Sequence, residues 1–342
     1  MGESPLASPG ATRALLEAYG LATKHRLGQN FLVSNAVIEK IMDLAELTGT
    51  ERVLEVGPGI GTLTLALLAE GGRVVAVEAD RELEPVLSAH AAAHPNLAFL
   101  MGDALSVDGE KIVEAAGGAP EVMVSNLPYN VAATIILKYL QEMASLRRLV
   151  VMVQAEVADR ICAAPGNKTY GAYTAKLALL ARVTGRFEVG PGNFMPPPHV
   201  DSAVVRLDRA PLTDPATGKP LSAACLAAVG TVIDAAFAQR RKTIRNSMSA
   251  SGFEKGALDA AFAACGVAPT CRAETLAPED FVRLAVALEG AEGAATGGAG
   301  AASGGPAAAV AAPDAPAAVN ATDAPATATD VPATPDEGAH HA

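Results

Sequence analysis

The chain has 342 residues, of which 50% are apolar, 18% charged and only 4% aromatic, and its formal net charge at pH 7 is −11. No run approaches the roughly 18 apolar residues that a membrane span needs, and the N-terminus contains no basic and apolar block of the secretory kind. The four cysteines form no C-x-x-C pair, which argues against a zinc site or a disulfide framework. We therefore expect a soluble, cytoplasmic and monomeric protein.

The last part of the chain differs from the rest in composition. From Ala291 to Ala342, 34 of 52 residues are Ala, Gly or Pro, and none is aromatic, leucine or isoleucine. Such a segment cannot bury enough apolar surface to offset the entropy lost on ordering. Residues 289–342 are therefore predicted to form a disordered tail. This tail holds seven acids and no lysine or arginine, so residues 1–288 carry 30 acids against 26 bases.

Short β-branched runs alternate with helical patterns as far as Leu207, which is typical of a parallel sheet covered by helices on both faces. Seven strands are predicted, at Arg52 to Val56, Arg73 to Glu78, Leu97 to Met101, Glu121 to Ser125, Leu149 to Gln154, Arg182 to Val189 and Ala203 to Leu207. Helical patterns lie among them, as at Ala36 to Leu47, Thr62 to Glu70 and Ala132 to Met143. The expected fold class is α/β with a mostly parallel sheet.

After Leu207 the pattern becomes helical, with helices predicted at Ala223 to Ser249, Lys255 to Cys265 and Pro278 to Leu288. A segment rich in Pro, Thr and Gly, from Asp208 to Pro220, precedes these helices. The chain is thus predicted to hold an α/β domain over residues 1–207 and a small all-helical domain over residues 208–288, followed by the tail.

A glycine-rich loop or an acidic residue lies at the end of each of the first three predicted strands. The loop Gly57-Pro58-Gly59-Ile60-Gly61 allows close approach of the backbone to a ligand, but its third glycine departs from the dinucleotide fingerprint. Glu78 follows Gly57 by 21 residues and is placed to accept hydrogen bonds from ribose hydroxyls. Asp103, at the end of the third strand, can accept from an adenine amino group. Together these positions favour a cofactor that contains adenosine.

The fourth strand ends in Ser125-Asn126-Leu127-Pro128-Tyr129. The exocyclic amine of adenine is a poor nucleophile because its lone pair is delocalised into the ring, so an enzyme that alkylates it must orient the nitrogen. The Asn126 side-chain oxygen and the Leu127 carbonyl can both accept from that amine, Pro128 stiffens the turn, and Tyr129 offers a face on which the base can stack. The plainer alternative is a turn that only closes a buried strand.

With these loops, the chain resembles the ribosomal RNA small-subunit adenine dimethyltransferases of the KsgA type over roughly residues 20–285. The resemblance also rests on the segments KHRLGQNFL from Lys24, QAEVA from Gln154, NFMPPPHVDSAV from Asn193 and FAQRRKTIRN from Phe237. It implies a Rossmann-like class I methyltransferase that uses S-adenosylmethionine to dimethylate two adjacent adenosines near the 3′ end of small-subunit ribosomal RNA. The implied partner is that RNA within an assembling small ribosomal subunit. The tail has no counterpart in the family pattern.

The resemblance also implies roles for individual residues. The cofactor-binding residues would be Asn30, Leu32, Gly57, Glu78, Asp103 and Asn126. The catalytic pocket would consist of Asn126, Leu127, Pro128 and Tyr129, with Phe194 as a second wall opposite Tyr129. No metal is expected, because the sulfonium of the cofactor already makes the methyl carbon electrophilic.

The densest basic cluster contains Arg240, Arg241, Lys242 and Arg245, which we expect to bind RNA. On a continuous helix, Arg241 and Arg245 share one face at the i, i+4 spacing, which suits contacts along a phosphate backbone. Lys24 to Arg26 and the pair Arg147 and Arg148 are expected to be secondary clusters. The plainer alternative is a solvated helix face.

Three other functions share part of this pattern. An NAD-dependent oxidoreductase would use the glycine loop and Glu78, but would give Asn126 to Tyr129 no role. A non-catalytic ribosome-assembly factor would keep the fold and dock without chemistry. The large-subunit methylases that confer antibiotic resistance share the core motifs, whereas Leu127 and the segment from Arg240 to Asn246 favour the small-subunit branch.

Overall fold

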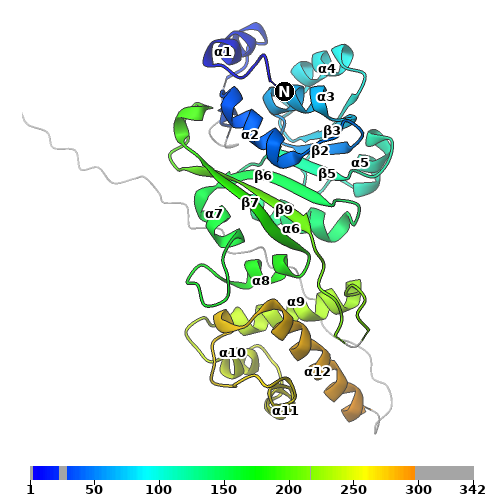
Figure 1. The fold of residues 1–342 in the computed structure, drawn as a ribbon, viewed down its shortest axis with the longest axis vertical. Coiled ribbons are helices and arrows are strands. Elements are labelled where there is room, and N and C mark those ends of the chain that lie inside the picture. The colour runs from blue at the N-terminus through cyan, green and yellow to red at the C-terminus, as the bar shows by residue number, and fades with distance from the viewer. Residues whose placement is uncertain (1–2, 23–28, 216, 297–342) are drawn as a thin grey trace, which may run out of the picture. The chain divides into compact units, whose positions relative to one another are not determined.

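A seven-stranded sheet forms the centre of the α/β part in a computed structural model of the protein (Figure 1). The structure describes residues 3–22, 29–215 and 217–296. The strands lie side by side in the order β4 (Leu97–Met101), β3 (Arg73–Glu78), β2 (Arg52–Val56), β5 (Val122–Asn126), β6 (Arg148–Gln154), β9 (Ser202–Arg209) and β7 (Ala181–Val189). The first five are parallel, and β9 runs antiparallel to both of its neighbours. The mostly parallel seven-stranded sheet predicted from the sequence is confirmed.

Each central strand is apolar on both faces because it separates two hydrophobic cores. In β2, Val53 packs into one core and its neighbour Leu54 into the other. The helices on the Val53 side are α2 (Asn35–Ala45) and α3 (Thr62–Glu70), and those on the Leu54 side include α5 (Gly109–Ala116) and α6 (Ala132–Glu142). Alternating side chains of a strand point to opposite faces, so an unbroken apolar run is the expected signature of such a layered sheet.

The order of the strands places a topological switch point between β2 and β5. From β2 the chain continues outward through β3 and β4, and it then returns to the other side of β2 to form β5. The loops that leave the carboxyl ends of β2 and β5 therefore diverge, and a crevice opens between them. Helix α4 (Glu84–Ala93) lies in the connection between β3 and β4.

A second sheet, of two short strands, was not predicted from the sequence. β1 (Phe31–Leu32) pairs antiparallel with β8 (Phe194–Met195), so that Phe31 lies opposite Met195 and Leu32 opposite Phe194. Strands of two residues carry no periodic pattern, which is why sequence inspection could not detect them. Helix α1 (Pro9–Ala18) contributes Leu16 to a small cluster that also contains Phe31.

The C-terminal helices share their hydrophobic core with the sheet. α9 (Ala223–Phe237), α10 (Ile244–Ala250), α11 (Lys255–Cys265) and α12 (Pro278–Thr296) contribute to the same cluster of buried side chains as β9. Helices α7 (Ala155–Ile161) and α8 (Ala172–Ala178) lie between them and the sheet (Figure 1). All described residues belong to one compact unit. α12 runs eight residues past Leu288, into the segment expected to be a tail, whereas residues 297–342 lie outside the described part.

The prediction of one continuous helix from Ala223 to Ser249 is wrong, because the helix ends at Phe237 and α10 begins at Ile244. The buried hydroxyl of Ser247 donates to the carbonyl of Ala235 at 2.7 Å and accepts from the backbone N–H of Gln239 at 3.0 Å. It thus occupies the place of the i, i+4 bond that would continue α9. The side chain of Thr243 then caps α10 by accepting from the N–H of Asn246.

Replacement of Ser247 by alanine tests this arrangement. Ser247→Ala leaves a buried carbonyl and a partly buried N–H without their shared partner, so we expect a loss of about 1 to 3 kcal/mol in the free energy of unfolding, measured by urea denaturation. Ser249→Ala on the same helix is the matched control and should change stability by less than about 0.5 kcal/mol. Equal effects of the two substitutions would show that the hydroxyl does not hold the turn.

Candidate active site

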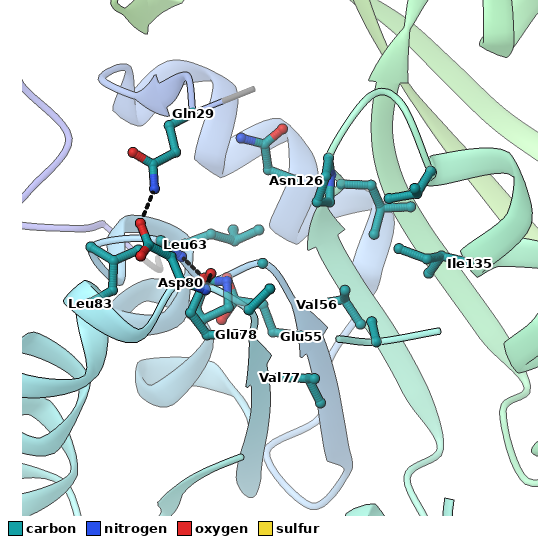
Figure 2. A pocket seen from close by; sticks show the side chains of 18 of the residues that line it. Gln29, Glu55, Val56, Leu63, Val77, Glu78, Asp80, Leu83, Asn126 and Ile135 are labelled. Carbon is teal, nitrogen blue, oxygen red and sulfur yellow. Dashed lines mark hydrogen bonds between the residues drawn. The ribbon is translucent and has the colours of Figure 1, made fainter. Parts of the chain in front are cut away.

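A cavity of about 410 Å³ lies at the carboxyl ends of β2, β3 and β5, where the switch point places it (Figure 2). Nine of the ten residues predicted to bind cofactor or to form the catalytic pocket line it: Asn30, Leu32, Gly57, Glu78, Asp103, Asn126, Leu127, Pro128 and Tyr129. They come from five separate segments of the chain. The tenth residue, Phe194, lies elsewhere and is described below.

The glycine loop lies close against its neighbours. Gly57, Gly59 and Gly61 have φ values of 71°, 60° and 88°, which side chains rarely adopt. A Cβ at Gly57 would lie 3.4 Å from Pro128, so this glycine brings the loop after β2 into contact with the loop after β5. A Cβ at Gly61 would lie 2.8 Å from the ring of His90, which donates from Nε2 to the carbonyl of Ile60 at 3.0 Å. His90 therefore supports the loop from α4, a role that the sequence did not suggest.

Glu78 organises the backbone at one end of the cavity. Its carboxylate accepts from the N–H of Gly59 at 3.1 Å and from the N–H of Asp80 at 2.8 Å. Burial raises its pKa, and these two backbone donors oppose that shift. Asp80 in turn accepts from the side-chain amide of Gln29 at 2.7 Å, as Figure 2 shows. Sequence inspection missed Gln29 and Asp80, although Asp80 follows Glu78 by only two residues.

A further carboxyl group in the cavity wall, Glu55, was also missed. Its side chain is 1% exposed and accepts from the hydroxyl of Thr64 at 2.6 Å. Burial, together with the nearby charge of Glu78, raises its pKa to about 8 against the opposing effect of the Thr64 hydrogen bond. The signal was present in the sequence, because an acid in the middle of the apolar strand RVLEV has no solvent to face.

The described side chains that line the cavity carry negative charge or none, and Glu55, with its pKa of about 8, is largely protonated near pH 7. Glu55, Glu78, Asp80 and Asp103 contribute carboxyl groups, and no lysine, arginine or histidine is among the described lining residues. Asp103 is exposed at this edge, where one of its oxygens accepts from the N–H of Leu105 at 2.9 Å. Such a surface favours a ligand that carries positive charge and opposes a diphosphate.

The side chain of Asn126 has a defined orientation. Its amide nitrogen donates to the carbonyl of Asn30 at 3.3 Å, so Oδ1 remains as an acceptor on the cavity side of β5. The next residue, Leu127, is fixed by its N–H, which donates to the carbonyl of Met152 at 3.1 Å. Asn126 therefore links the segment before β1 to the loop after β5, and both Asn126 and Leu127 line the cavity.

Tyr129 is held by a residue that the sequence did not identify. Its hydroxyl lies 2.5 Å from that of Ser202, which is fully buried at the start of β9. Burial raises the pKa of Tyr129, and the hydrogen bond with Ser202 opposes the shift. With its hydroxyl fixed and its body half-buried at the cavity, the ring has little rotational freedom.

Phe194 does not line the cavity in this structure. Its side chain is only 3% exposed, and it packs in the core that contains Leu32 and Val189. Its strand β8 pairs with β1, so Phe194 lies opposite Leu32, which lines the cavity. A second wall opposite Tyr129 would require Phe194 to leave this core.

The predicted basic face on one helix is wrong, because Arg241 lies in the turn between α9 and α10 while Arg245 lies on α10. Arg245 makes two hydrogen bonds with Asp259, at 2.5 and 2.6 Å. Of the secondary clusters, Arg148 is bound by Glu46 and Asp208 and Arg147 by Glu51. Lys24 to Arg26 lie outside the described residues.

Comparisons with known proteins agree with this geometry. The family model described as ribosomal RNA adenine dimethylase matches residues 20–289. This chain belongs to the ribosomal RNA adenine dimethylase family. The ribosomal RNA small subunit methyltransferase A of Kineococcus radiotolerans is 40% identical over 85% of this chain and 95% of its own length. The protein of the same name from Geobacillus thermodenitrificans is 38% identical over 83% of this chain and 97% of its own length.

Solved structures show the same fold as this family member. The 23S rRNA methyltransferase ErmE is 26% identical, with a TM-score of 0.56 over 76% of this chain and all of its own. A dimethyladenosine transferase from Plasmodium falciparum is 23% identical, with a TM-score of 0.62 over 74% of this chain and 95% of its own. In the described part of this dimethylase, no helix has the length and apolar character of a membrane span, and no three His, Cys, Asp or Glu side chains are grouped as metal ligands would be.

The buried carboxyl of Glu55 predicts a specific pH dependence of stability. Its pKa is about 8 in the folded protein and near 4.5 as an ordinary glutamate, so between these values the folded state binds the extra proton. The free energy of unfolding should therefore fall as pH rises through this range, by at most about 1.4 kcal/mol per pH unit from this group. Glu55→Gln keeps an acceptor for Thr64 but cannot ionise, and should remove this slope in urea denaturation. The exposed Glu114→Gln is the control; an unchanged slope in Glu55→Gln would contradict the assignment.

Proposed function

We propose that this chain transfers methyl groups from S-adenosylmethionine to the exocyclic amine of adenosines in ribosomal RNA, producing dimethyladenosine. The observation that carries the proposal is the Asn126 side chain: its amide nitrogen donates to the Asn30 carbonyl, which leaves its oxygen as an acceptor on a residue that lines the cavity next to Leu127. Two adjacent acceptors are what a planar amine needs in order to be oriented for alkylation. Membership of the adenine dimethylase family supports the same conclusion.

The charge of the cavity fits this cofactor. S-adenosylmethionine carries a sulfonium and an ammonium against one carboxylate, so its net charge is positive, whereas the described wall holds four carboxyl groups and no base. NAD would bring a diphosphate to the same glycine loop, where no described lining residue could neutralise it. The wall charge therefore argues against the oxidoreductase alternative.

Three residues that would hold the cofactor follow adjacent strands of the sheet: Gly57 follows β2, Glu78 ends β3 and Asp103 follows β4. Glu78 can accept hydrogen bonds from the ribose hydroxyls, and Asp103 can accept one from the adenine amine. Because Gly57 has no side chain, the methionine part of the cofactor can approach the backbone closely there. Asn30 and Leu32 approach from β1. When bound, the cofactor supplies an electrophilic methyl group with a neutral thioether as leaving group.

The protein's part in the reaction is to position the amine. Asn126 Oδ1 and the Leu127 carbonyl accept from the two amine hydrogens, and the Tyr129 ring, fixed through Ser202, provides a face on which the base can stack. The nitrogen becomes cationic on attack, after which it can release its proton to solvent. Catalysis of this kind depends on orientation and acceptor placement and requires no strong base.

The substrate proposed more finely is the pair of adjacent adenosines near the 3′ end of small-subunit ribosomal RNA, within an assembling subunit. The names of the relatives from Kineococcus and Geobacillus support the small subunit. The exposed bases Arg240, Arg241 and Lys242 support RNA docking outside the cavity. Since Arg245 is already bound to Asp259 and Arg240 to backbone carbonyls, we assign the phosphate contacts in this turn to Arg241 and Lys242.

The direct test is incubation of the protein with labelled S-adenosylmethionine and immature small subunits, followed by digestion of the RNA to nucleosides. We expect the label in dimethyladenosine. Large subunits should be tested in parallel, because ErmE, named for action on 23S rRNA, has the same fold. Label in large-subunit RNA would favour that alternative, and label in cytidine, in protein or in no product would contradict the proposal.

Asn126→Ala tests the acceptor directly. Loss of one hydrogen bond to the reacting amine should lower turnover by about 10²-fold or more, by analogy with the loss of one donor from an oxyanion hole. The variant should remain folded because Asn126 is only half-buried. Asn193→Ala, which removes a half-buried amide that donates to the Gly190 carbonyl, is the control. Turnover of Asn126→Ala at the wild-type rate would show that the assigned role is wrong.

A further inference from the structure

The loop between α7 and α8 has a fixed structure and carries an exposed lysine. The backbone N–H and the hydroxyl of Thr169 both donate to the Asn167 side chain, at 3.2 and 3.1 Å. Tyr170, 1% exposed, packs its ring against Phe237 at the end of α9, with ring centroids 5.9 Å apart. Lys168 lies at the exposed tip between these anchors.

Arg240 joins this loop to the turn between α9 and α10. Its guanidinium donates to the carbonyl of Lys168 at 2.7 Å and to the carbonyl of Tyr170 at 3.4 Å. A second connection lies nearby, since the N–H of Gly166 donates to the carbonyl of Glu274 at 2.7 Å. Two segments that are 72 residues apart in sequence are therefore held side by side (Figure 1).

The result is a basic surface patch, defined here as Lys168, Arg240, Arg241 and Lys242. All four residues are exposed, and in the described structure Lys168, Arg241 and Lys242 make no ion pair. Glu274 lies 3.7 Å from Arg240 and is the acid that approaches the patch. In a chain of net charge −11, this concentration of unpaired bases is a marked local exception.

We propose that Lys168 binds an RNA phosphate as part of one docking surface with Arg241 and Lys242, and that Arg240 is the positioning residue that holds Lys168 in that surface. The proposal rests on the proposed function and adds to it a contact from the α/β part of the chain. The patch contains none of the exposed large apolar side chains, which are Tyr19, Val183, Val200 and Val286. Protein partners favour aromatic and apolar anchors, whereas phosphates need only charge and donors.

The proposal predicts the salt dependence of RNA binding. Lys168→Ala should reduce the slope of log K against log salt concentration by about 0.7 to 0.9, the loss expected for one phosphate contact. The probe is a labelled fragment of small-subunit ribosomal RNA that contains the two adjacent adenosines. Lys111→Ala, on the exposed side of α5, is the matched control and should leave the slope unchanged. Because Lys168 is exposed, its replacement does not threaten the fold.

Arg240 is tested by a double-mutant cycle. If Arg240 acts by holding the loop, Arg240→Ala should already remove the contribution of Lys168, so that adding Lys168→Ala changes the slope no further. If the two substitutions reduced the salt slope by independent, additive amounts, the positioning role of Arg240 would be overturned. An unaltered slope in Lys168→Ala would overturn the phosphate contact, while production of dimethyladenosine by the same variant would leave the proposed function standing. If the wild-type protein itself produced no dimethyladenosine, the proposed function would be contradicted instead.

Discussion

The pairing of β2 with β5 is the constraint on which the site depends. Leu54 lies opposite Met123 in this parallel pair, and further along the Ser125 hydroxyl accepts from the N–H of Val56 at 2.9 Å. The two strands therefore end at the same level, with the Gly57 loop on one side and the Asn126 turn on the other. Since the chain leaves these strands in opposite directions, the space between the loops stays open.

The two recognition surfaces of the molecule have opposite charge. The cavity wall contains Glu55, Glu78, Asp80 and Asp103, and burial makes it costly to keep Glu55 and Glu78 ionised. A cationic ligand would lower that cost, which agrees with the proposed cofactor. The basic patch lies outside the cavity, on the turn after α9 and the loop before α8. On the proposed function, this separation would let one surface bind a cationic cofactor and the other a polyanionic RNA.

The helical part is attached to the sheet by packing and by single hydrogen bonds at turns. Phe262 and Phe281 lie in the same cluster of buried side chains as Val205 of the sheet. The Ser247 hydroxyl ends α9, and the end of α9 is the place where Arg240 meets the Lys168 loop. The position of the basic patch thus follows from where one helix is interrupted.

The sequence by itself determined the seven strands and the switch-point loops, and it singled out nine residues that the structure places along one cavity, because apolar periodicity and strand-end polar residues are local signals. It could not determine the ends of α9 or the pairing of β1 with β8, since these depend on contacts between distant segments. For the same reason it placed Arg241 and Arg245 on one face and Phe194 at the cavity. Tertiary packing alone decides whether a buried acid such as Glu55 lines a site. It also decides whether an arginine faces solvent or pairs with an aspartate, because packing sets the neighbours of each side chain and its exposure to water.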